Sequence, residues 1–459
     1  MGSRKSTRNG SVTVELLAHG DVKPDVLTSH AALGCYQATP PEMGKLINIK
    51  NKLFYTGHHT TLQHWYATFL IEGIAVGDIT FGMHEASPFY NSDQRSGRYC
   101  SAMFADPDFA ALEHYIREFW PEVGDAQVAG IMTYIRGAIE QYTGNLEAAT
   151  ALSKKHLIIE RPKLPLPSVE ANCAKIAQEQ MRMFIPIIFP TGFDFTVNLS
   201  ALVSLWASAW NPTMRAVTDL MRDLVLERFP EIAFMFAPEL RVADADDPDG
   251  LPVGFVGECL VKPEYRLEHL VVGKRVVEPD PKDMHPIDLL HFKPKYMDNI
   301  RTTVTAEITL SCATMGQDQR HRTIERSKPA FVGFAYLPPL LAELGLGEKL
   351  RETMKRWAEI SRVVPKSLAT ILAPYGAMVR YHKHGNLNAL AHEMAKRCCW
   401  LAQEEIYHLG TQMREQVLRL HPELHWVFAP PCVKDGGCGE GQRYCGVVIQ
   451  TFDFSERKV

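Results

Sequence analysis

The chain has 459 residues, a net charge of −4, 46% hydrophobic residues and 22% charged residues. This composition is ordinary for a globular protein of two or three domains, and the small net charge excludes a global basic field for nucleic acid or membranes. No apolar run reaches the roughly 20 residues that a membrane span needs. Residues 1–11 are polar and lack the apolar core of a signal peptide, so we expect a short disordered tail there.

The ten cysteines are scattered along the chain, and two of them, Cys398 and Cys399, are adjacent. Disulfide frameworks of small secreted proteins use dense, spaced cysteines instead. We therefore expect a reducing, cytoplasmic setting.

The first half of the sequence alternates between short strand-like runs and helical patterns. Strands are predicted early in 12–36 and over 65–72, and a third (195–199) leads into an apolar helix within 191–210. Further helices are predicted over 42–55, 73–81, 113–153, 169–183 and 213–229.

A second series of elements follows an acidic stretch, residues 243–250, whose turn residues predict a linker. The order of elements then repeats: a strand, a polar loop with a histidine, a helix, a proline-started segment and a long helix opened by an asparagine. The ranges are 301–310, 317–328, 350–360, 365–372 and 386 to about 420. This order predicts a coarse internal duplication rather than a short-period repeat.

Two short motifs are rich in groups that bind anions. The segment 317–327 carries three arginines around His321, and Ser96-Gly97-Arg98-Tyr99 places a hydroxyl two residues from a guanidinium. Guanidinium forks suit phosphate and carboxylate, and flanking arginines disfavour protonation of a histidine between them. The alternative for each motif is a solvated surface turn.

Together, Gln317-x-x-Arg320-His321-Arg322 and Ser96-Gly97-Arg98-Tyr99 resemble two pieces of the signature of the flavin-dependent thymidylate synthases. In that family the arginine triplet and the later Ser-x-Arg-Tyr belong to one loop, whereas here they lie in different halves. The resemblance covers most of residues 12–230 and 285–422.

The first half resembles the family in three further places. His58-x-Thr60-x-x-x-His64 resembles a histidine segment, Arg182 resembles the phosphate-binding arginine, and Asn198 opens the core helix. Other positions are lost. His84 aligns only loosely with the signature histidine, with Met83 and Glu85 replacing both arginines, and Ser204 and Ala209 replace flavin contacts on the core helix.

The second half keeps the complementary set of positions. Asn386, His392, Arg397, Gln403 and Glu405 fit the spacing of the family's core helix. Thr370 stands where the phosphate arginine would be, and Glu325-Arg326-Ser327 resembles a truncated remnant of Ser-x-Arg-Tyr.

The resemblance implies an α/β (α+β) protein of two tandem, diverged thymidylate-synthase-complementing-protein-like halves, with a mixed sheet and long helices. The expected organisation is a tail (1–11), a first, nucleotide-phosphate half (12–242), a linker and connecting segment (243–284), a second, flavin half (285–425) and a Cys/Gly-rich tail (426–459).

The resemblance also implies an activity: FAD-dependent methyl transfer to C5 of a dUMP-like pyrimidine nucleotide, with NADPH and methylenetetrahydrofolate as co-substrates. Family members are homotetramers with sites between subunits, so a tandem chain is expected to form a homodimer acting as a pseudo-tetramer with composite sites. FAD would contact His58, Gln317, Arg320, His321, Arg322, Asn386, His392 and Arg397. The nucleotide would contact Ser96, Arg98, Tyr99 and Arg182, while Arg397 and His321 are the expected catalytic residues.

Two other functions stay open from the sequence. One is a related flavin and folate enzyme acting on another nucleotide, for example by hydroxymethylation. The other is a non-catalytic flavin- or nucleotide-binding relative, which the many lost positions favour. His58, His59 and His64 could also form a metal cluster, although no carboxylate accompanies them at ligand spacing, and His392 could be a structural histidine.

The C-terminal tail carries Cys432, Cys438 and Cys445, with His421 or His425 nearby. These residues could form a Cys₃His zinc site, although spacings of six and seven are looser than the usual Cys-x₂₋₄-Cys pair. The alternative is three reduced surface cysteines. No Gly-x-Gly-x-x-Gly follows a predicted strand, which argues against a Rossmann dinucleotide domain.

Overall fold

The computed structural model describes residues 3–84, 90–98, 102–241, 260–284, 289–434, 438, 440–441, 444–447 and 457–459. The chain divides into two compact units. Unit 1 comprises residues 1–132, 187–249 and 363–372, and unit 2 comprises 133–186, 250–362 and 373–459. The units therefore interleave along the chain, whereas the sequence predicted two halves in succession.

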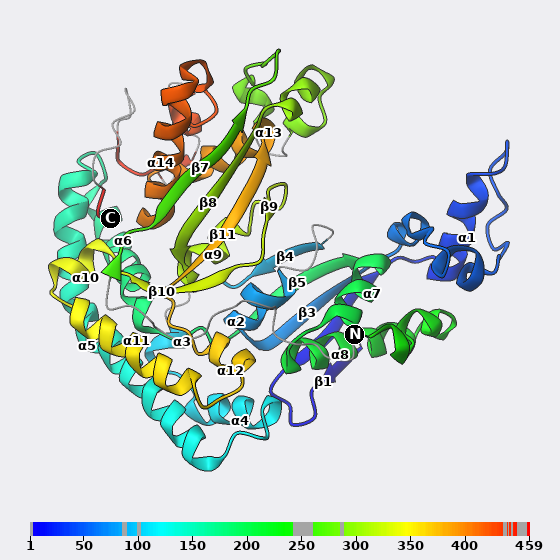
Figure 1. Ribbon diagram of the computed structural model, residues 1–459, viewed down its shortest axis with the longest axis horizontal. Coiled ribbons are helices and arrows are strands. Elements are labelled where there is room, and N and C mark those ends of the chain that lie inside the picture. Colours follow the sequence, from blue (N-terminus) through cyan, green and yellow to red (C-terminus); the bar gives the residue numbers. More distant parts are fainter. Residues whose placement is uncertain are drawn as a thin grey trace. The chain divides into compact units, whose positions relative to one another are not determined.

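Unit 1 contains an antiparallel sheet with the strand order β1-β2-β3-β5-β4 (Figure 1). Alternate residues of its central strand, Ala67, Phe69 and Ile71, are buried, as a half-buried strand requires. Phe69 lies directly opposite Phe195, which adds an aromatic cross-strand pair to the core. The strands are β1 (Arg4–Ser6), β2 (Thr13–His19), β3 (Tyr66–Ala75), β4 (Tyr90–Gln94) and β5 (Pro190–Asn198).

The expected disordered tail over residues 1–11 is wrong for the described residues 3–11. Residues 4–6 form β1, which pairs with β2, and the Glu118 carboxylate accepts hydrogen bonds from the backbone of Asn9 and Ser11. These bonds satisfy backbone donors of the turn between the strands, which a count of polar residues could not foresee.

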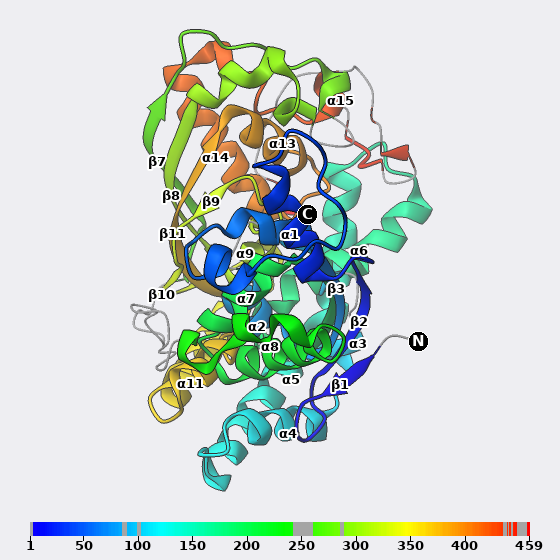
Figure 2. The same ribbon diagram turned by 90° about the vertical axis from the view of Figure 1, so that its right-hand side faces the viewer.

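Unit 2 contains a mixed sheet in the order β6-β10-β11-β8-β7, with β9 also paired to β11; β6 and β10 run parallel. Figure 2 shows β7, β8 and β11 side by side from a second direction. The strands are β6 (Leu260–Val261), β7 (Glu264–Val271), β8 (Thr303–Ser311), β9 (Glu325–Arg326), β10 (Ala330–Tyr336) and β11 (Ala377–Asn386).

The strands β6 and β7 belong to this sheet, although both lie in the range expected as a linker and connecting segment, 243–284. Side chains of α14 satisfy part of the backbone of the edge strand β7. Gln412 and Gln416 each accept a 2.8 Å hydrogen bond, from the N–H groups of Tyr265 and Leu267. Edge strands need such cover, and here it depends on residues almost 150 positions away.

The two sheets share one local construction. In unit 1, β5 ends at Asn198, whose side chain caps α7 by accepting from the Ala201 N–H at 2.8 Å. In unit 2, β11 ends at Asn386, which caps α13 through the Ala389 N–H at 3.0 Å. Both asparagines lie opposite the first residue of the neighbouring strand, β3 or β8. Asparagine is a preferred N-cap, so the same local signal begins both core helices.

The second core helix is interrupted where the sequence predicted one long helix from 386 to about 420. The helix α13 ends at Arg397 and α14 begins at Glu404. Gly410 lies so close to this break that an added Cβ would be 3.4 Å from the sulfur of Cys398. Trp400 and Ala402 within the break are buried against Tyr407, so tertiary packing stabilises it.

Of the other helices, α5 crosses from unit 1 into unit 2 at residue 133. The helix predicted over 42–55 forms only one helical turn, Lys50–Phe54, after Gly44, whose φ of 99° is incompatible with a right-handed helix. Within the described part of the chain, no helix is both long and apolar enough to cross a membrane. The helices are α1 (Pro24–Gly34), α2 (Val76–Asp78), α3 (Ala102–Ala105), α4 (Phe109–Phe119), α5 (Asp125–Glu160), α6 (Leu166–Met181), α7 (Leu199–Ser208), α8 (Pro212–Leu226), α9 (Cys312–Asp318), α10 (Pro339–Glu343), α11 (Gly347–Ser361), α12 (Lys366–Ile371), α13 (Leu387–Arg397), α14 (Glu404–Leu420) and α15 (Pro431–Lys434).

Candidate functional site

Four of the residues that match the family signature form a hydrogen-bonded chain in unit 2. The Arg182 guanidinium donates to the Gln403 side-chain oxygen at 3.0 Å, and Gln317 Nε2 donates to the same oxygen at 2.5 Å. Arg397 Nη2 donates to the Gln317 backbone carbonyl, also at 2.5 Å. Two arginines from distant parts of the sequence are thereby linked by two glutamines. We call Arg182, Gln317, Arg397 and Gln403 the arginine–glutamine cluster.

Arg182 lies in a single turn, Arg182–Phe184, that follows α6. It is only 4% exposed, and its guanidinium lies 5.1 Å from the centre of the Tyr375 ring. The sequence also allowed a solvated helix face at this position, but burial rules that out. Its guanidinium donates to the neutral amide of Gln403, and its charge lowers the pKa of the buried Glu405 against the effect of burial. A guanidinium fork that is only partly used in this way can also bind an anionic ligand.

Several buried polar atoms around this cluster have no hydrogen-bond partner in the described structure. They are Arg182 Nε, Gln317 Oε1, His321 Nε2 and Gln403 Nε2. Buried polar atoms are usually paired, and when several converge on one place they indicate a ligand site. The set includes both donors and an acceptor, which suits a ligand with mixed polarity.

The segment that follows α9, residues 319–326, carries Arg320, His321 and Arg322, and we call it the arginine loop. Arg326 holds this loop closed by donating to the backbone carbonyls of Asp318, His321 and Ile324 and to the Asp318 carboxylate. Arg326 therefore acts as a clamp inside the loop, because its guanidinium donates to acceptors of the loop and of Asp318 rather than to a ligand.

A buried ionic cluster supports the arginine loop from beneath. Lys383 of β11 donates to both the Asp318 and the Glu393 carboxylates, and Tyr381 donates to Asp318 at 2.9 Å. The side chains of Lys383, Asp318 and Glu393 are 4% exposed or less. Arg326 and Lys383 hold the pKa of Asp318 well below its usual range against the opposing effect of burial, whereas burial raises the pKa of Glu393.

His321 lies close enough to these charged groups for them to affect its pKa. Burial, followed by the positive charges of Arg397 and Lys383, holds its pKa well below the usual value. The imidazole is therefore neutral near pH 7. It can accept or donate a hydrogen bond there, but it cannot act as a cationic acid.

Two acidic residues at the start of α14 lie beneath Gln403. Glu405 is fully buried and accepts hydrogen bonds from the Ser311 N–H, the Ser311 hydroxyl and the Thr314 hydroxyl. Burial, together with Glu179 and Glu405, raises the pKa of Glu404 to about 8, and the Tyr336 hydroxyl donates to it at 3.1 Å. Glu404 is therefore protonated at neutral pH, although the nearby charge of Arg457 favours its ionised form.

The remaining second-half residues with an expected flavin role surround the same region. Arg320 is exposed, while Arg322 and His392 are half-buried. The ring of His392 stacks on His291 at 5.7 Å. Asn386 is committed through its side-chain oxygen to capping α13.

The first-half residues with expected roles lie at two separate ends of the unit 1 sheet. His58 is exposed and precedes the turn His59–His64 that enters β3, whose first residue pairs with Asn198. Ser96 and Arg98 follow β4 at the other end, where the Arg95 N–H bonds to the Gly192 carbonyl. These ends are separated by six residues of β5, or about 20 Å. The structure therefore does not gather His58 with Ser96 and Arg98 inside unit 1.

Within its motif, the Ser96 hydroxyl accepts a 3.2 Å hydrogen bond from the Arg98 N–H, which forms a tight serine turn. Tyr99 and Glu85 lie outside the described residues. His84 is hydrogen-bonded to the Ser92 hydroxyl at 2.8 Å and stacks on Tyr90.

The three tail cysteines differ in exposure: Cys432 is half-buried, Cys438 is exposed and Cys445 is buried. His421 and His425, the histidines expected to complete the site, have other surroundings. His421 Nδ1 bonds to Glu423 at 2.9 Å, and His425 is exposed.

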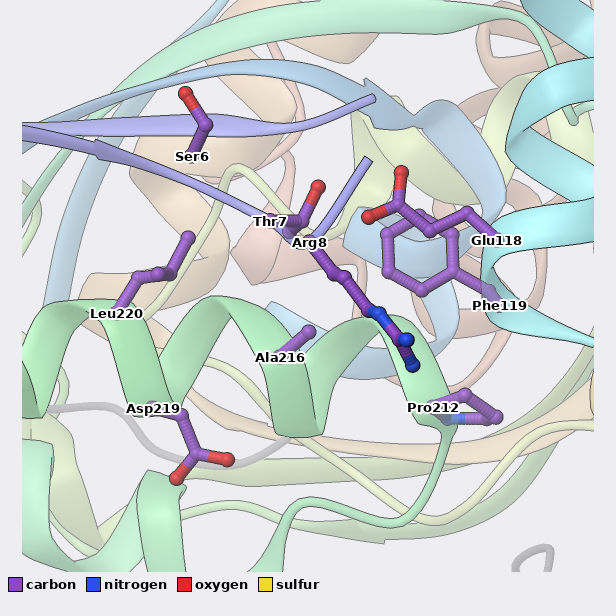
Figure 3. Close-up of a pocket in the computed structure, with 9 residues that line it drawn as sticks. All are labelled: Ser6, Thr7, Arg8, Glu118, Phe119, Pro212, Ala216, Asp219 and Leu220. Atoms are coloured by element: carbon purple, nitrogen blue, oxygen red, sulfur yellow. The ribbon is translucent and has the colours of Figure 1, made fainter. Parts of the chain in front are cut away.

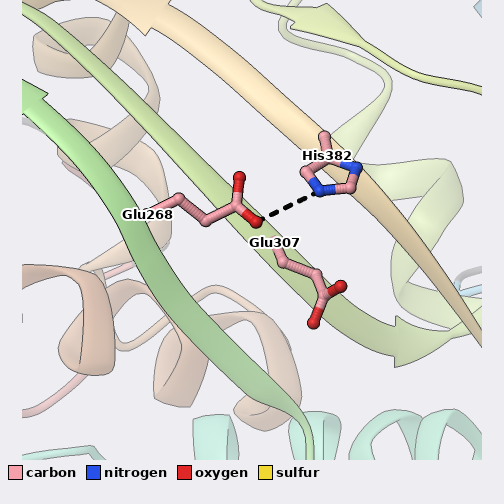
Figure 4. A group of neighbouring side chains, drawn as sticks. All are labelled: Glu268, Glu307 and His382. Atoms are coloured by element: carbon pink, nitrogen blue, oxygen red, sulfur yellow. Dashed lines mark hydrogen bonds and ion pairs between the residues drawn. The ribbon is translucent and has the colours of Figure 1, made fainter.

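Among the described residues, the one trio of metal-type ligand atoms lying within 4.8 Å of each other is Glu268, Glu307 and His382 (Figure 4). The three residues lie on adjacent strands of unit 2, and His382 is bonded to Glu268 at 3.2 Å. Glu307 already pairs with Arg266 at 2.8 Å and Arg380 at 3.6 Å. Two cations compensate its charge, so the trio is an exposed ion-pair network on a sheet face.

A hollow of about 360 Å³ in unit 1 is lined by Arg8, Glu118 and Asp219 among others (Figure 3). Its acidic groups already have partners: Glu118 accepts from the β1–β2 turn, and Asp219 accepts from Trp206, Arg222 and Arg241. The hollow therefore offers a ligand little beyond Arg8.

The fold and the arginine–glutamine cluster define an α/β protein with a buried site suited to an anion. The model of the thymidylate synthase complementing protein family matches residues 15–231 and 301–423, which is more than half of the chain. The chain therefore belongs to this family, and the match falls into two separate segments, as the sequence motifs do.

Solved structures that match the chain include two of thymidylate synthase X from Helicobacter pylori, both determined with FAD and dUMP. Each is 19% identical to this chain, and each match covers 50% of this chain and 99% of the other; the TM-scores are 0.31 and 0.32. No protein with curated functional information matches the sequence. An identity of 19% is too low to carry residue roles across.

Sequence reasoning missed the residues that support the cluster. Lys383, Glu393 and Asp318 form its ionic base, and Glu404 lies below it. The one signal available in the sequence was Lys383, within the strand pattern of residues 377–386. A buried strand position seldom carries a charge unless a partner of opposite charge lies nearby.

Proposed function

We propose that this protein is a flavin-dependent enzyme that transfers a one-carbon unit to C5 of a pyrimidine nucleotide such as dUMP, with methylenetetrahydrofolate and NADPH as co-substrates. The observation that carries the proposal is the contact of Arg182 with Gln403. It joins the expected phosphate arginine of the first half to the flavin-side residues of the second half.

This contact supports a composite site built within one chain. Thr370, the residue of the second half equivalent to Arg182, is 1% exposed, and its hydroxyl donates to the Lys366 carbonyl inside α12. A threonine cannot supply the guanidinium that Arg182 provides in the first half. We infer one composite site for each chain, formed by a tandem duplication whose two copies have lost complementary residues.

The residues present fit FAD. Its pyrophosphate needs donors, which Arg320 and Arg322 supply, and its ring system needs polar partners, which His321, His392 and Arg397 supply. When bound, the flavin would supply hydride transfer. Arg182 would hold the nucleotide phosphate, and Arg397, fixed by the Gln317 carbonyl, would polarise the pyrimidine.

Neutral His321 fits this role better than a charged histidine would. Arg397 already provides positive charge, and an imidazole without charge adds a hydrogen-bonding group without repelling it. Ser96 and Arg98, with Tyr99, would add a second set of phosphate donors.

The direct test is the visible spectrum of the purified protein, titrated with FAD and then with dUMP. We expect a bound flavin in the wild type, loss of flavin in Arg322→Ala, and weakened dUMP binding with retained flavin in Arg98→Ala. A wild type without flavin affinity would reject the proposal. Unchanged nucleotide affinity in both Arg98→Ala and Arg182→Ala would reject the composite site.

Mixing the Arg98→Ala and Arg322→Ala proteins tests whether sites cross between chains of a dimer. If they cross, one of the two sites in a mixed dimer carries no mutation, and part of the binding returns. If each site lies within one chain, mixing restores nothing, because each chain keeps its own defect. Gel filtration should give a homodimer, the oligomer that a tandem chain of a tetrameric family predicts.

The second candidate function is a non-catalytic flavin- or nucleotide-binding protein, and the loss of a donor at Thr370 favours it. Turnover separates the two: a binder retains flavin and nucleotide but releases no methylated or hydroxymethylated product. A hydroxymethyl product, or a preference for another nucleotide, would identify a related enzyme instead. The cytoplasmic setting remains part of this proposal.

A further inference from the structure

The described residues Arg457–Val459 are packed into unit 2 without belonging to a helix or a strand. Arg457 is 3% exposed and Val459 is 1% exposed. One hydrogen bond joins these two residues, and the others recorded for the segment go to residues 49 to 299 positions earlier in the chain. The segment is therefore held by surrounding helices, as a bound peptide would be.

Side chains, rather than a neighbouring strand, pair with the backbone of this segment. The Glu160 carboxylate, at the end of α5, accepts from the Lys458 N–H at 3.0 Å and from the Val459 N–H at 3.2 Å. Gln180 of α6 donates to the Lys458 carbonyl at 2.6 Å. The Gln180 oxygen accepts from the Leu340 N–H at 2.8 Å, so its amide is fixed in the orientation that donates to the segment. Sites for extended peptides obtain affinity from such main-chain hydrogen bonds.

The Val459 side chain fills an apolar pocket. It packs in one buried cluster with Leu157, Val169, Cys173 and Leu340. These residues come from α5, α6 and α10, so three helices form the walls. Because the members of the cluster are uncharged, the pocket favours an aliphatic side chain over a charged one.

Arg457 occupies a second pocket, at the break between α13 and α14. Its guanidinium lies 5.3 and 5.0 Å from the ring centres of Trp400 and Tyr407, and Nη2 donates to the Ala402 carbonyl at 2.7 Å. His408 of α14 donates to the Arg457 carbonyl at 2.8 Å. A planar guanidinium suits this pocket because it stacks on aromatic faces and donates in fixed directions, whereas a lysine offers only a point charge.

The second pocket lies next to the arginine–glutamine cluster. Ala402, which accepts from Arg457, directly precedes Gln403, whose side-chain oxygen accepts from Arg182 at 3.0 Å. Residues 398–403 belong to neither α13 nor α14, so contacts from other segments hold them in place. Arg457 supplies such contacts, and its presence in the pocket therefore affects the position of Gln403.

We propose that unit 2 contains a peptide-binding site, that Arg457–Val459 is its ligand, and that occupancy of the site orders the break and so positions Gln403. The ligand class is a short peptide with an arginine and, two residues later, an aliphatic side chain. The middle side chain contributes little, because Lys458 is 42% exposed where it pairs with Glu343 at 3.3 Å. An effect on nucleotide binding rests on the proposed function, whereas the peptide site and the ordering of the break do not.

The experiment vacates the site in the full chain by combining Arg457→Ala with Val459→Asp, and then adds a fluorescein-labelled peptide with the sequence of residues 455–459. Fluorescence anisotropy should show binding to this double variant and at least about tenfold weaker binding to the wild type, where the segment in cis competes. Adding Glu160→Gln should weaken peptide binding by about tenfold, because an acceptor oxygen is replaced by a donor. Adding Glu170→Gln instead, at an exposed carboxylate of α6, is the control and should leave it unchanged.

Hydrogen exchange measures the ordering of the break. The amides of residues 398–403 should exchange faster in the double variant than in the wild type, and the peptide should slow them again. If the double variant is partly unfolded, the peptide should raise its unfolding temperature, because a ligand of the folded state stabilises that state. The double variant should also bind dUMP at least about fivefold more weakly, and the peptide should restore the affinity.

Three results would overturn the proposal. They are a double variant that binds no peptide by anisotropy or thermal shift, equal peptide binding by the wild type and the double variant, and peptide binding that restores no protection over residues 398–403. Unchanged dUMP affinity in a double variant that has lost this protection would overturn the positioning of Gln403. A wild type that does not bind dUMP would instead reject the proposed function, and the anisotropy and exchange measurements would still decide whether the peptide site exists.

Discussion

The side-chain oxygen of Gln403 accepts a hydrogen bond from Arg182, a residue 221 positions earlier in the chain, at 3.0 Å. Both side chains are buried, at 1% and 4% exposure. This bond links the two segments that the family model matches separately, and the first prediction tests it.

Arg182→Met and Gln403→Leu should each weaken nucleotide binding, by about 10- to 100-fold for the arginine, because a charge-assisted bond is lost. The double variant should lose less than the sum, since both substitutions remove the same bond. Isothermal titration with dUMP measures the coupling. Arg419→Met, at an exposed arginine of α14, is the control and should bind normally. Strict additivity would show that the two residues act separately.

Arg326→Lys should reduce flavin affinity by about tenfold while the protein stays folded. A lysine keeps the charge but cannot donate simultaneously to the three loop carbonyls and to Asp318, so the arginine loop loses its clamp. Fluorescence titration with FAD provides the measurement. Arg266→Lys, at an exposed pair on the same sheet, should have no effect. Equal affinities of wild type and Arg326→Lys would mean that the loop does not depend on the clamp.

His321 should make the protein less stable in mild acid. Its folded pKa lies well below the ordinary 6.5, so the unfolded chain binds more protons below that pH. Its contribution to stability is therefore complete above about pH 6.5 and is lost as the pH falls, with a slope of up to about 1.4 kcal/mol per pH unit. Urea unfolding between pH 5 and 7 should show this slope in the wild type and a smaller one in His321→Gln. Parallel curves would contradict the neutral state of His321 in the folded protein.

Glu404 should have the opposite effect. Burial, Glu179 and Glu405 raise its folded pKa to about 8 from an ordinary 4.5, so the folded state binds the extra proton between these values. Stability is complete below about pH 4.5 and falls as the pH rises towards 8. Glu404→Gln keeps a neutral side chain that can accept from Tyr336, so its free energy of unfolding should change less between pH 5 and 8. The same fall in both proteins would place the titrating group elsewhere.

Residues 457–459 should contribute measurably to the stability of unit 2. Arg457 is buried between the rings of Trp400 and Tyr407, at 5.3 and 5.0 Å, and donates to the Ala402 carbonyl at 2.7 Å. Arg457→Ala should lower the free energy of unfolding by about 2–4 kcal/mol, because it removes buried contacts and leaves a carbonyl unpaired. Chemical denaturation measures this loss, and Lys355→Ala on α11 is the surface control. A loss below about 0.5 kcal/mol would show that Arg457 is not part of the folded core.

The sequence by itself determined the features that depend on neighbouring residues. The asparagines that begin α7 and α13 were expected at Asn198 and Asn386, because a cap bonds to a backbone group only three residues away. The mixed α/β class and the family were also predicted correctly, since both depend on local periodicity and short motifs. The flavin and nucleotide roles of individual residues remain predictions.

Only the tertiary structure decided how distant residues meet. Arg182 and Gln403 each look like an ordinary polar residue on a helix, and their bond exists because the turn after α6 and the start of α14 meet in unit 2. The expected long helix breaks after Arg397 because Trp400 and Ala402 gain more from burial than continuous helix would provide. The residues 4–11 are ordered because Glu118 supplies acceptors more than 100 positions away. Such contacts depend on the closure of long loops, and no local pattern in the sequence records which loops close.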